Sequence, residues 1–129
     1  MPATKEAMVA AVHEYCRAES EKDKDAWMAL FAEGAVHDDP VGFRSSVGLD
    51  KIAAFWDWFQ PSDVELWCEE PVIVCGNEAI AIMRCRTGPV DARQESGRIV
   101  DQFVFDDAGR ITNLRAFYDF DPDQFPQEA

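Results

Sequence analysis

The order of sequence patterns predicts an α+β fold with helices on one face of a mostly antiparallel sheet. Up to about residue 59, apolar residues recur at the three- and four-residue spacing of helices. From residue 64 onward, short β-rich runs alternate with turn sequences such as Gly76-Asn77. Helices followed by a meander of strands indicate that the helices pack on one side of a sheet. Such a sheet can curl around its helices and leave an apolar pocket at one end.

Three helices are predicted in the first half of the chain. The first begins after Thr4, whose side chain can cap it. The second begins at residue 23 or 25, carries Phe31 on its apolar face and ends at Gly34. The third covers about residues 50–59.

Strands are predicted to make up most of the rest. A short extended piece over residues 36–42 precedes the third helix, because a proline at position 40 biases the residue before it away from helix. The later strands cover, in order, residues 64–68, 71–75, 78–87, about 92–105 and 110–120. The acidic end, residues 121–129, is predicted to be a loosely packed tail. We expect a single domain over residues 1–129, with its core at about residues 5–120.

Composition and charge exclude several classes of protein. With 12 Lys and Arg against 25 Asp and Glu, the net charge is −13, and such a field repels nucleic acid and anionic lipid. No apolar run approaches the roughly 20 residues that span a bilayer, and the start shows no secretory signal. We therefore expect no nucleic-acid or membrane partner and a cytoplasmic location. The four cysteines lack metal-ligand spacing, and His37-Asp38-Asp39 lacks a further ligand at suitable spacing, so no metal site is predicted.

Asp101 occupies an unusual place for a charged residue. Side chains alternate between the two faces of a strand, so Asp101 points the same way as Ile99 and Phe103. An ionised carboxylate on an apolar face is costly unless it is paired. Asp101 is therefore protonated, which makes it a hydrogen-bond donor at pH 7, or paired with an arginine such as Arg98 or Arg115, or on a face open to solvent.

Two further residues are candidates for the same pocket. Tyr15 falls on the apolar stripe of the first helix, so its ring is expected to be buried and its hydroxyl needs a partner. Asp39 is held extended by the proline that follows it and faces an apolar stretch. The ordinary alternatives are a core tyrosine and a turn-forming or solvated aspartate. Asp38 competes with Asp39, because a shift of one residue exchanges the two faces of a strand.

Segments between about residues 8 and 118 follow a spacing known from one family. They are Val12-His13-Glu14-Tyr15, Leu30-Phe31-Ala32, Asp38-Asp39-Pro40-Val41-Gly42, Asn77-Glu78-Ala79, Asp101-Gln102-Phe103, Ala108-Gly109 and Leu114-Arg115-Ala116-Phe117. On these segments the chain resembles the bacterial ketosteroid isomerases, within the nuclear-transport-factor-2-like and SnoaL-like superfamily. The resemblance implies a cone-shaped fold around an apolar pocket and a homodimer formed through the sheet.

The resemblance also implies roles for three residues. The family's catalytic tyrosine corresponds to Tyr15, its proton-shuttling base to Asp39 and its protonated aspartic acid to Asp101. In that family, which is itself the established case of a carboxylic acid kept neutral to donate a hydrogen bond, a β,γ double bond moves into conjugation with a ketone. The base shuttles the proton while the two donors stabilise the charge that forms on the ketone oxygen. The implied substrate is an apolar, steroid-like ketone, and no cofactor is needed.

Four residues are predicted to contact this substrate: Trp56, Met83, Phe103 and Tyr118. The last three suit a core equally well. Trp56 stands where well-known members have a second tyrosine that supports the catalytic one, and an indole N–H donates but cannot accept. The hydrogen bonds around Tyr15 are therefore expected to differ from the family pattern. Arg84 and Arg86 lie in a strand that is mostly neutral in the family, and alternation predicts that they point away from the pocket.

Two other functions stay open. A polyketide cyclase-like or dehydratase-like enzyme of the same fold would use a different polar set, with His13 or His37 in the pocket. A non-catalytic binding protein would hold a steroid or another apolar ligand without exchanging protons with it.

Overall fold

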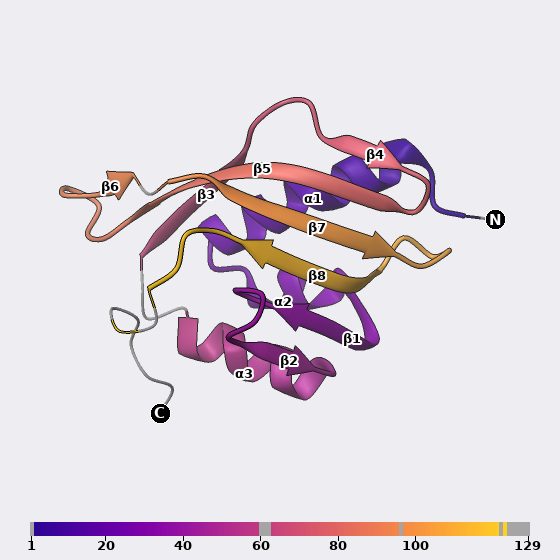
Figure 1. The fold of residues 1–129 in the computed structure, drawn as a ribbon, viewed down its shortest axis with the longest axis horizontal. Helices are drawn as coiled ribbons and strands as arrows, with labels where there is room; N and C mark the ends of the chain where they lie inside the picture. Colours follow the sequence, from indigo (N-terminus) through magenta and orange to yellow (C-terminus); the bar gives the residue numbers. More distant parts are fainter. Residues whose placement is uncertain (1, 60–62, 96, 122, 124–129) are drawn as a thin grey trace.

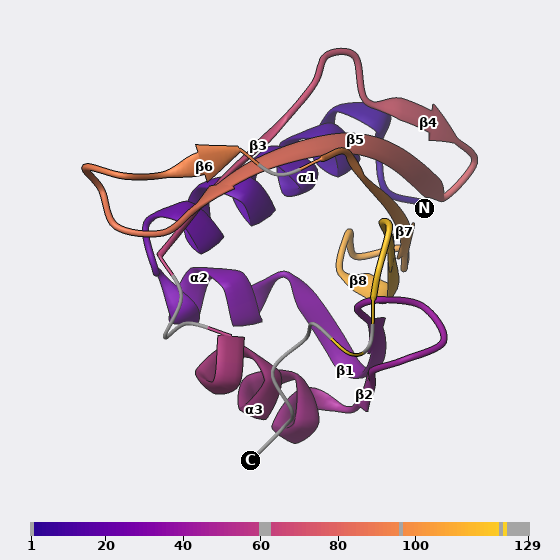
Figure 2. The ribbon, with the colours of Figure 1, turned by 60° about the vertical axis from the view of Figure 1, so that its left-hand side comes forward.

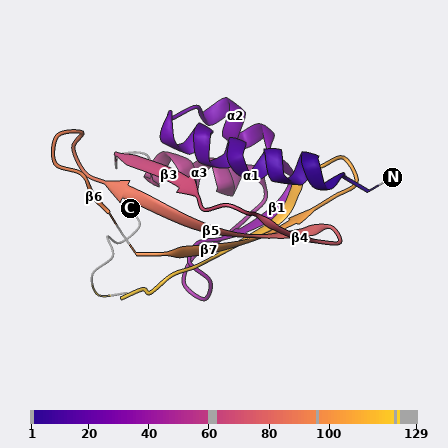
Figure 3. The same ribbon diagram turned by 90° about the horizontal axis from the view of Figure 1, so that it is seen from above.

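The computed structural model describes residues 2–59, 63–95, 97–121 and 123, over which the chain forms three helices and one eight-stranded sheet. The elements, in chain order, are α1 (Lys5–Ser20), α2 (Lys24–Ala29), β1 (Phe31–Asp38), β2 (Ser45–Val47), α3 (Leu49–Phe59), β3 (Val64–Cys68), β4 (Ile73–Cys75), β5 (Glu78–Thr87), β6 (Gln94–Glu95), β7 (Ile99–Phe105) and β8 (Ile111–Phe117). The helices lie on one side of the sheet (Figure 3), which confirms the predicted α+β class. No helix in the described residues is long and apolar enough to cross a membrane.

The sheet follows the order β2-β1-β8-β7-β5-β3, with β4 and β6 paired to β5. Its pairs are antiparallel except for β1 and β8, which run parallel. Figures 1 and 2 show the sheet curving around α1, α2 and α3, so that its two ends approach the helices from different sides. The helices and this curved sheet both contribute residues to the lining of one cavity.

Side-chain contacts fix the position of α1 along the sheet. Thr4 caps the helix by accepting a hydrogen bond from the N–H of Ala7, as predicted. At the other end of the helix, the Ser20 hydroxyl donates to the carbonyl oxygen of Leu66 at 2.9 Å and accepts from its N–H at 2.8 Å. Leu66 lies opposite Cys85 on β5. The last turn of α1 is therefore level with the C-terminal part of β5.

The prediction that the second helix includes Phe31 and ends at Gly34 is wrong. The helix stops at Ala29, and Phe31 begins β1 opposite Ile111 of β8. The Leu30 carbonyl accepts a hydrogen bond from the Ile111 N–H at 2.8 Å, so pairing with a distant strand replaces the next helical turn. Gly34, with φ of +77°, lies in β1 at a shift of register, where its backbone freedom permits the irregularity.

Other differences concern strand bounds. The strand predicted over about residues 92–105 is two strands, β6 and β7, and the one predicted over residues 110–120 ends at Phe117. Strand β2, paired with β1, was not predicted, because its three residues are mostly polar. Most of the predicted tail, residues 121–129, lies outside the described residues.

Trp27 is the centre of the core next to the curved sheet. It is completely buried, and its ring lies 4.8 Å from both Phe31 and Trp56 and 5.8 Å from Tyr15, measured between centroids. It thus joins all three helices to the first strand. Large buried aromatic rings contribute strongly to core stability because of the area that they remove from water.

Replacing Trp27 by alanine is expected to lower the free energy of unfolding by about 3–5 kcal/mol, because it leaves a large cavity among these rings. Denaturation in urea measures the change. Val90→Ala is the control, since Val90 is 79% exposed, and we expect a change within about 0.5 kcal/mol. Equal losses in the two variants would contradict this account of the core.

Candidate functional site

The structure contains a cavity of about 750 Å³ between the helices and the sheet. This volume lies within the range of roughly 300–1,000 Å³ found for small-molecule sites. Its walls are mostly apolar and aromatic, with contributions from α3, β3, β5 and β7, and they hold a small group of ionisable side chains. The lining residues are Tyr15, Glu19, Asp39, Phe55, Trp58, Phe59, Val64, Leu66, Cys85, Thr87, Gly97, Arg98, Ile99, Asp101, Tyr118 and Asp119.

Tyr15, Asp39 and Asp101, which the sequence singled out, all line this one cavity. They come from α1, from the turn after β1 and from β7, so segments far apart in the sequence meet here. The cavity thus holds three polar groups in a mostly apolar surrounding.

Asp101 is a buried, unpaired carboxyl group. It is 3% exposed, and its Oδ1 atom has no hydrogen-bond partner among the described residues. Burial, followed by the nearby Asp39 and Glu19, raises its pKa well above the usual value. The arginines considered as partners lie beside other acids: Arg115 is 3.6 Å from Asp38, and Arg98, which also lines the cavity, is 4.0 Å from Glu69. These surroundings favour the neutral form of Asp101, and a neutral carboxyl group can donate a hydrogen bond.

Asp39 has the opposite character, because other groups support its charge. Burial raises its pKa to about 6, while a hydrogen bond from Tyr118 and the charge of Arg44 oppose the rise. The Tyr118 hydroxyl donates to Asp39 Oδ1 at 2.9 Å. At pH 7 the group is mostly ionised and yet a strong enough base to accept a proton. Its neighbour Asp38 faces Arg115 and does not line the cavity.

Tyr15 lines the cavity from the buried face of α1. The residue is 3% exposed, and its ring packs edge-on against Phe103 with centroids 5.6 Å apart. Burial, followed by the nearby acids Glu19, Asp101 and Asp39, raises its pKa well above the usual value. The phenol therefore keeps its proton and, like Asp101, can donate a hydrogen bond to a ligand.

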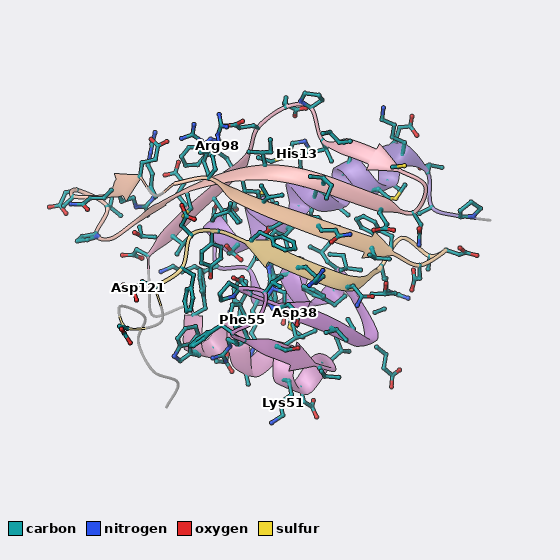
Figure 4. All side chains as sticks on the ribbon, viewed as in Figure 1. His13, Asp38, Lys51, Phe55, Arg98 and Asp121 are labelled. Carbon is teal, nitrogen blue, oxygen red and sulfur yellow. The ribbon has the colours of Figure 1, made fainter. Side chains whose placement is uncertain are left out.

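The predicted ligand contacts divide into two groups. Tyr118 lines the cavity, but Trp56, Met83 and Phe103 are at most 5% exposed and belong to the core behind it. Helix α3 contributes other rings instead, which are Phe55, Trp58 and Phe59. Their three- and four-residue spacing places them on one side of the helix. In Figure 4, Lys51 extends from α3 away from the body of the molecule.

Glu19 is a site residue that the sequence reasoning missed. It is 7% exposed and lines the cavity with Tyr15. Burial and then the charge of Asp39 raise its pKa to about 8, and the Tyr15 hydroxyl, as a hydrogen-bond partner, opposes the rise. The available signal was its position four residues after Tyr15, which puts both on one face of the helix. Glu19 also begins a run of charged residues, which hid this signal.

The two histidines lie outside the cavity lining. His13 is on the surface beside Glu70, with 3.0 Å between Nε2 and Oε1 (Figure 4). His37 is buried among aromatic rings, 4.7 Å from that of Phe55, and burial lowers its pKa to about 4. Among the described residues, chemistry that needs a histidine in the cavity therefore has no candidate.

The two arginines of β5 also lie outside the lining, as predicted. Arg84 pairs with Glu69 and Glu95, at 3.0 and 2.9 Å, and Arg86 lies 3.8 Å from Glu65. Their charges are therefore balanced on the surface and do not select the ligand.

A family model for the SnoaL-like domain matches residues 12–114, which include Tyr15, Asp39 and Asp101. The chain belongs to the SnoaL-like domain family. This fits the fold described above, and it assigns the curved sheet and its helices to the nuclear-transport-factor-2-like architecture.

Solved structures similar to this SnoaL-like chain include proteins with different activities. A Δ5-3-ketosteroid isomerase from Mycobacterium sp. has 28% identity and a TM-score of 0.75, with 88% of this chain and 93% of that chain covered. RV0760c from Mycobacterium tuberculosis, in complex with estradiol-17beta-hemisuccinate, has 23% identity and a TM-score of 0.76, with 88% and 94% covered. An LEH-like epoxide hydrolase from M. tuberculosis has 22% identity and a TM-score of 0.75, with 88% and 84% covered.

The raised pKa values in this SnoaL-like chain predict that its stability falls as the pH rises from 6.5 to 8.5. Asp101 and Glu19 hold protons in the folded state that the unfolded chain releases at about pH 4. Their contribution is complete below the unfolded pKa and is lost as the pH rises through the folded one, about 8 for Glu19. Each group that stays protonated only in the folded state costs about 1.4 kcal/mol per pH unit.

Urea denaturation at several pH values measures this slope. Asp101→Asn is expected to make the slope shallower, because the amide does not titrate. Asp107→Asn, at an exposed position in the turn before β8, is the matched control and keeps the full slope. A wild-type stability that is flat over this range would contradict the assignment of neutral acids.

Proposed function

We propose that this protein is a ketosteroid isomerase-like enzyme, which moves a β,γ double bond into conjugation with a ketone. The observation that carries the proposal is the set of three polar groups in one apolar cavity: a carboxylate at Asp39, a neutral carboxyl at Asp101 and a phenol at Tyr15. A proton-transfer reaction next to a carbonyl needs one base and donors for the oxygen. The cavity supplies both.

In the proposed reaction, Asp39 removes the proton from the carbon between the ketone and the double bond. The electron pair of the broken C–H bond forms a dienolate, and the negative charge collects on the former ketone oxygen. Tyr15 and Asp101 donate hydrogen bonds to this oxygen, and the apolar walls strengthen them by excluding water. Asp39 then returns the proton to the far carbon of the dienolate. The base ends the cycle ionised.

Tyr118 and Arg44 adjust the base in this proposal. The hydrogen bond from Tyr118, 2.9 Å long, holds Oδ1 of Asp39. Oδ2, which lies 3.8 Å from His37 Nε2, is the oxygen proposed to take the proton. The guanidinium of Arg44 lies 4.4 Å from the ring centroid of Trp58 and lowers the pKa of Asp39. Both effects keep Asp39 ionised at neutral pH in a cavity that otherwise favours its neutral form.

The comparisons support an apolar ligand of steroid size. The isomerase from Mycobacterium sp. acts on a ketosteroid, and RV0760c holds a steroid derivative. The aromatic face of α3 and the aliphatic side chains of β3 offer this chain a surface for flat, apolar rings.

A Δ5-3-ketosteroid is expected to be converted to its conjugated isomer, which is followed by the ultraviolet absorbance of the enone. Asp39→Asn removes the base and is expected to lower kcat by a factor of about 10²–10⁴. Asp101→Leu and Tyr15→Phe each remove one donor, at a cost of about 10²–10³ in kcat. The control is Asp38→Asn, which alters the neighbouring acid outside the cavity and keeps most of the activity.

Conversion that survives Asp39→Asn would refute the role of the base. Binding of the steroid with no conversion by the wild type would instead support the second candidate, a non-catalytic binding protein. The size of the cavity and its apolar walls indicate that it binds a ligand, and this observation supports a binding protein as well as an enzyme.

We also infer that two copies associate through the outer face of the sheet. On this face, β5 and β7 present partly exposed aliphatic residues, namely Ile80, Ile82, Val100 and Val104. Sedimentation velocity is expected to show a particle of two 14.5 kDa chains. Val100→Asp is expected to shift it toward one chain, because it introduces a charge into the contact, whereas Val90→Asp on the exposed turn leaves it unchanged. A single-chain wild type would contradict the inference.

A further inference from the structure

Glu19 is a buried acid in the cavity that the reaction proposed above does not use. It is 7% exposed and borders the same space as Tyr15, Asp39 and Asp101. A buried carboxyl group is costly, whereas the residue directly after α1, Glu21, is an exposed acid. A stability role alone gives no reason for an acid at this position.

The geometry of α1 directs Glu19 toward Tyr15. The two residues are four apart, so they lie one above the other on the same face of the helix. Ser20 fixes this end of the helix against Leu66. Side chains on a helix lean toward its N-terminus, so the carboxyl group of Glu19 leans back toward the turn that carries Tyr15.

Other contacts of Tyr15 leave its hydroxyl available. The phenol ring packs against Trp27 and Phe103, with centroids 5.8 and 5.6 Å away. These are ring contacts, and the Nε1 atom of Trp27 makes no hydrogen bond to any described residue. A phenol oxygen both accepts and donates, so a buried Tyr15 benefits from a donor on one side and an acceptor on the other.

The surroundings of Glu19 favour its neutral form. Four titratable groups in the described part of the chain interact electrostatically with Glu19: Tyr15, Cys16, Asp39 and Asp101. The same cavity is also lined by Cys85, Tyr118 and Asp119. Strand β3 contributes the apolar Val64 and Leu66, and α3 contributes aromatic rings. The lining cation is Arg98, which is 66% exposed and lies 4.0 Å from Glu69 (Figure 4). No cation is among the causes that shift the pKa of Glu19.

We propose that Glu19 is the positioning residue for Tyr15: its neutral carboxyl group donates a hydrogen bond to the phenol oxygen, so that the phenol donates its own hydrogen to the ketone oxygen. This inference rests on the proposed isomerase function and deepens it. Hydrogen bonds in such a chain polarise and strengthen one another. When Glu19 loses its proton, the carboxylate accepts the hydrogen of Tyr15 instead. Tyr15 is then withdrawn from the ligand, and the activity falls.

The first test is the pH profile of kcat for the ketosteroid isomerisation. The wild type is expected to lose activity below about pH 6, where Asp39 takes up a proton, and above about pH 8, where Glu19 releases one. Glu19→Gln keeps a donor that does not titrate. It is expected to keep kcat at pH 7 within about threefold and to lose the alkaline fall, with KM little changed. Glu21→Gln, at the exposed end of the same helix, keeps the wild-type profile.

Tyr15→Phe separates action through Tyr15 from direct contact with the ligand. If Glu19 acts through Tyr15, the alkaline fall disappears in Tyr15→Phe, and adding Glu19→Gln to that variant changes the residual rate little. An alkaline fall that persists in Tyr15→Phe, or in Glu19→Gln, overturns the proposal.

Equilibrium binding of estradiol, whose phenol oxygen stands in for the dienolate oxygen, separates this inference from the isomerase proposal. The phenol keeps its proton up to about pH 10. Calorimetry is expected to show an affinity that falls about tenfold between pH 7 and pH 9 for the wild type and stays level for Glu19→Gln. This result without any turnover refutes the isomerase function and supports the role of Glu19. Turnover with an affinity that falls equally in both proteins refutes the role of Glu19 alone, and a wild type that neither binds nor turns over refutes both.

Discussion

The removal of water from one apolar cavity is the constraint on which the rest of this site depends. The rings of α3 and the aliphatic residues of β3 line the cavity together with a group of ionisable side chains. Burial is the largest cause of the pKa shift in Tyr15, Glu19, Asp39 and Asp101. Desolvation alone would make all of them neutral. What separates Asp39 from the other acids is its support, a hydrogen bond from Tyr118 and the charge of Arg44. A single apolar cavity can therefore hold both a base and hydrogen-bond donors, because groups next to Asp39 act on its pKa locally.

The sequence predicted those parts of the site that follow a local period. Alternation along a strand put Asp101 on an apolar face, and helical spacing put Tyr15 on a buried one. Local spacing could not decide between Asp38 and Asp39. The choice depends on Arg115, which lies opposite Asp38 on the neighbouring strand β8 and far away in the sequence. The predicted end of the second helix was wrong for the same reason, because it too depends on a contact with a distant strand. Phe31 fits a helical stripe equally well, and a strand about 80 residues later in the chain decides its state.

Membership of the SnoaL-like family leaves the chemistry open. Structures of similar shape include an isomerase and an epoxide hydrolase, both with a TM-score of 0.75 to this chain. The fold supplies an enclosed, curved sheet, and the polar residues inside it select the reaction. Here most of those residues are acids and phenols, and the histidines lie outside the lining of the cavity. Chemistry by proton transfer from carbon suits this set better than chemistry that needs a histidine.

The double hydrogen bond between Ser20 and Leu66 has a consequence for how such a site changes between related proteins. It fixes the axial position of α1, and a slide of one residue would require a translation of about 1.5 Å and a rotation of about 100°. Tyr15 and Glu19 would move together in such a slide, because they share the helix, while Asp101 on β7 would stay in place. The distance between Tyr15 and Glu19 would therefore stay the same, while the distance from both residues to Asp101 would change. Substitutions at the contact of α1 with β3 can therefore alter which ligand fits without changing any residue that touches it.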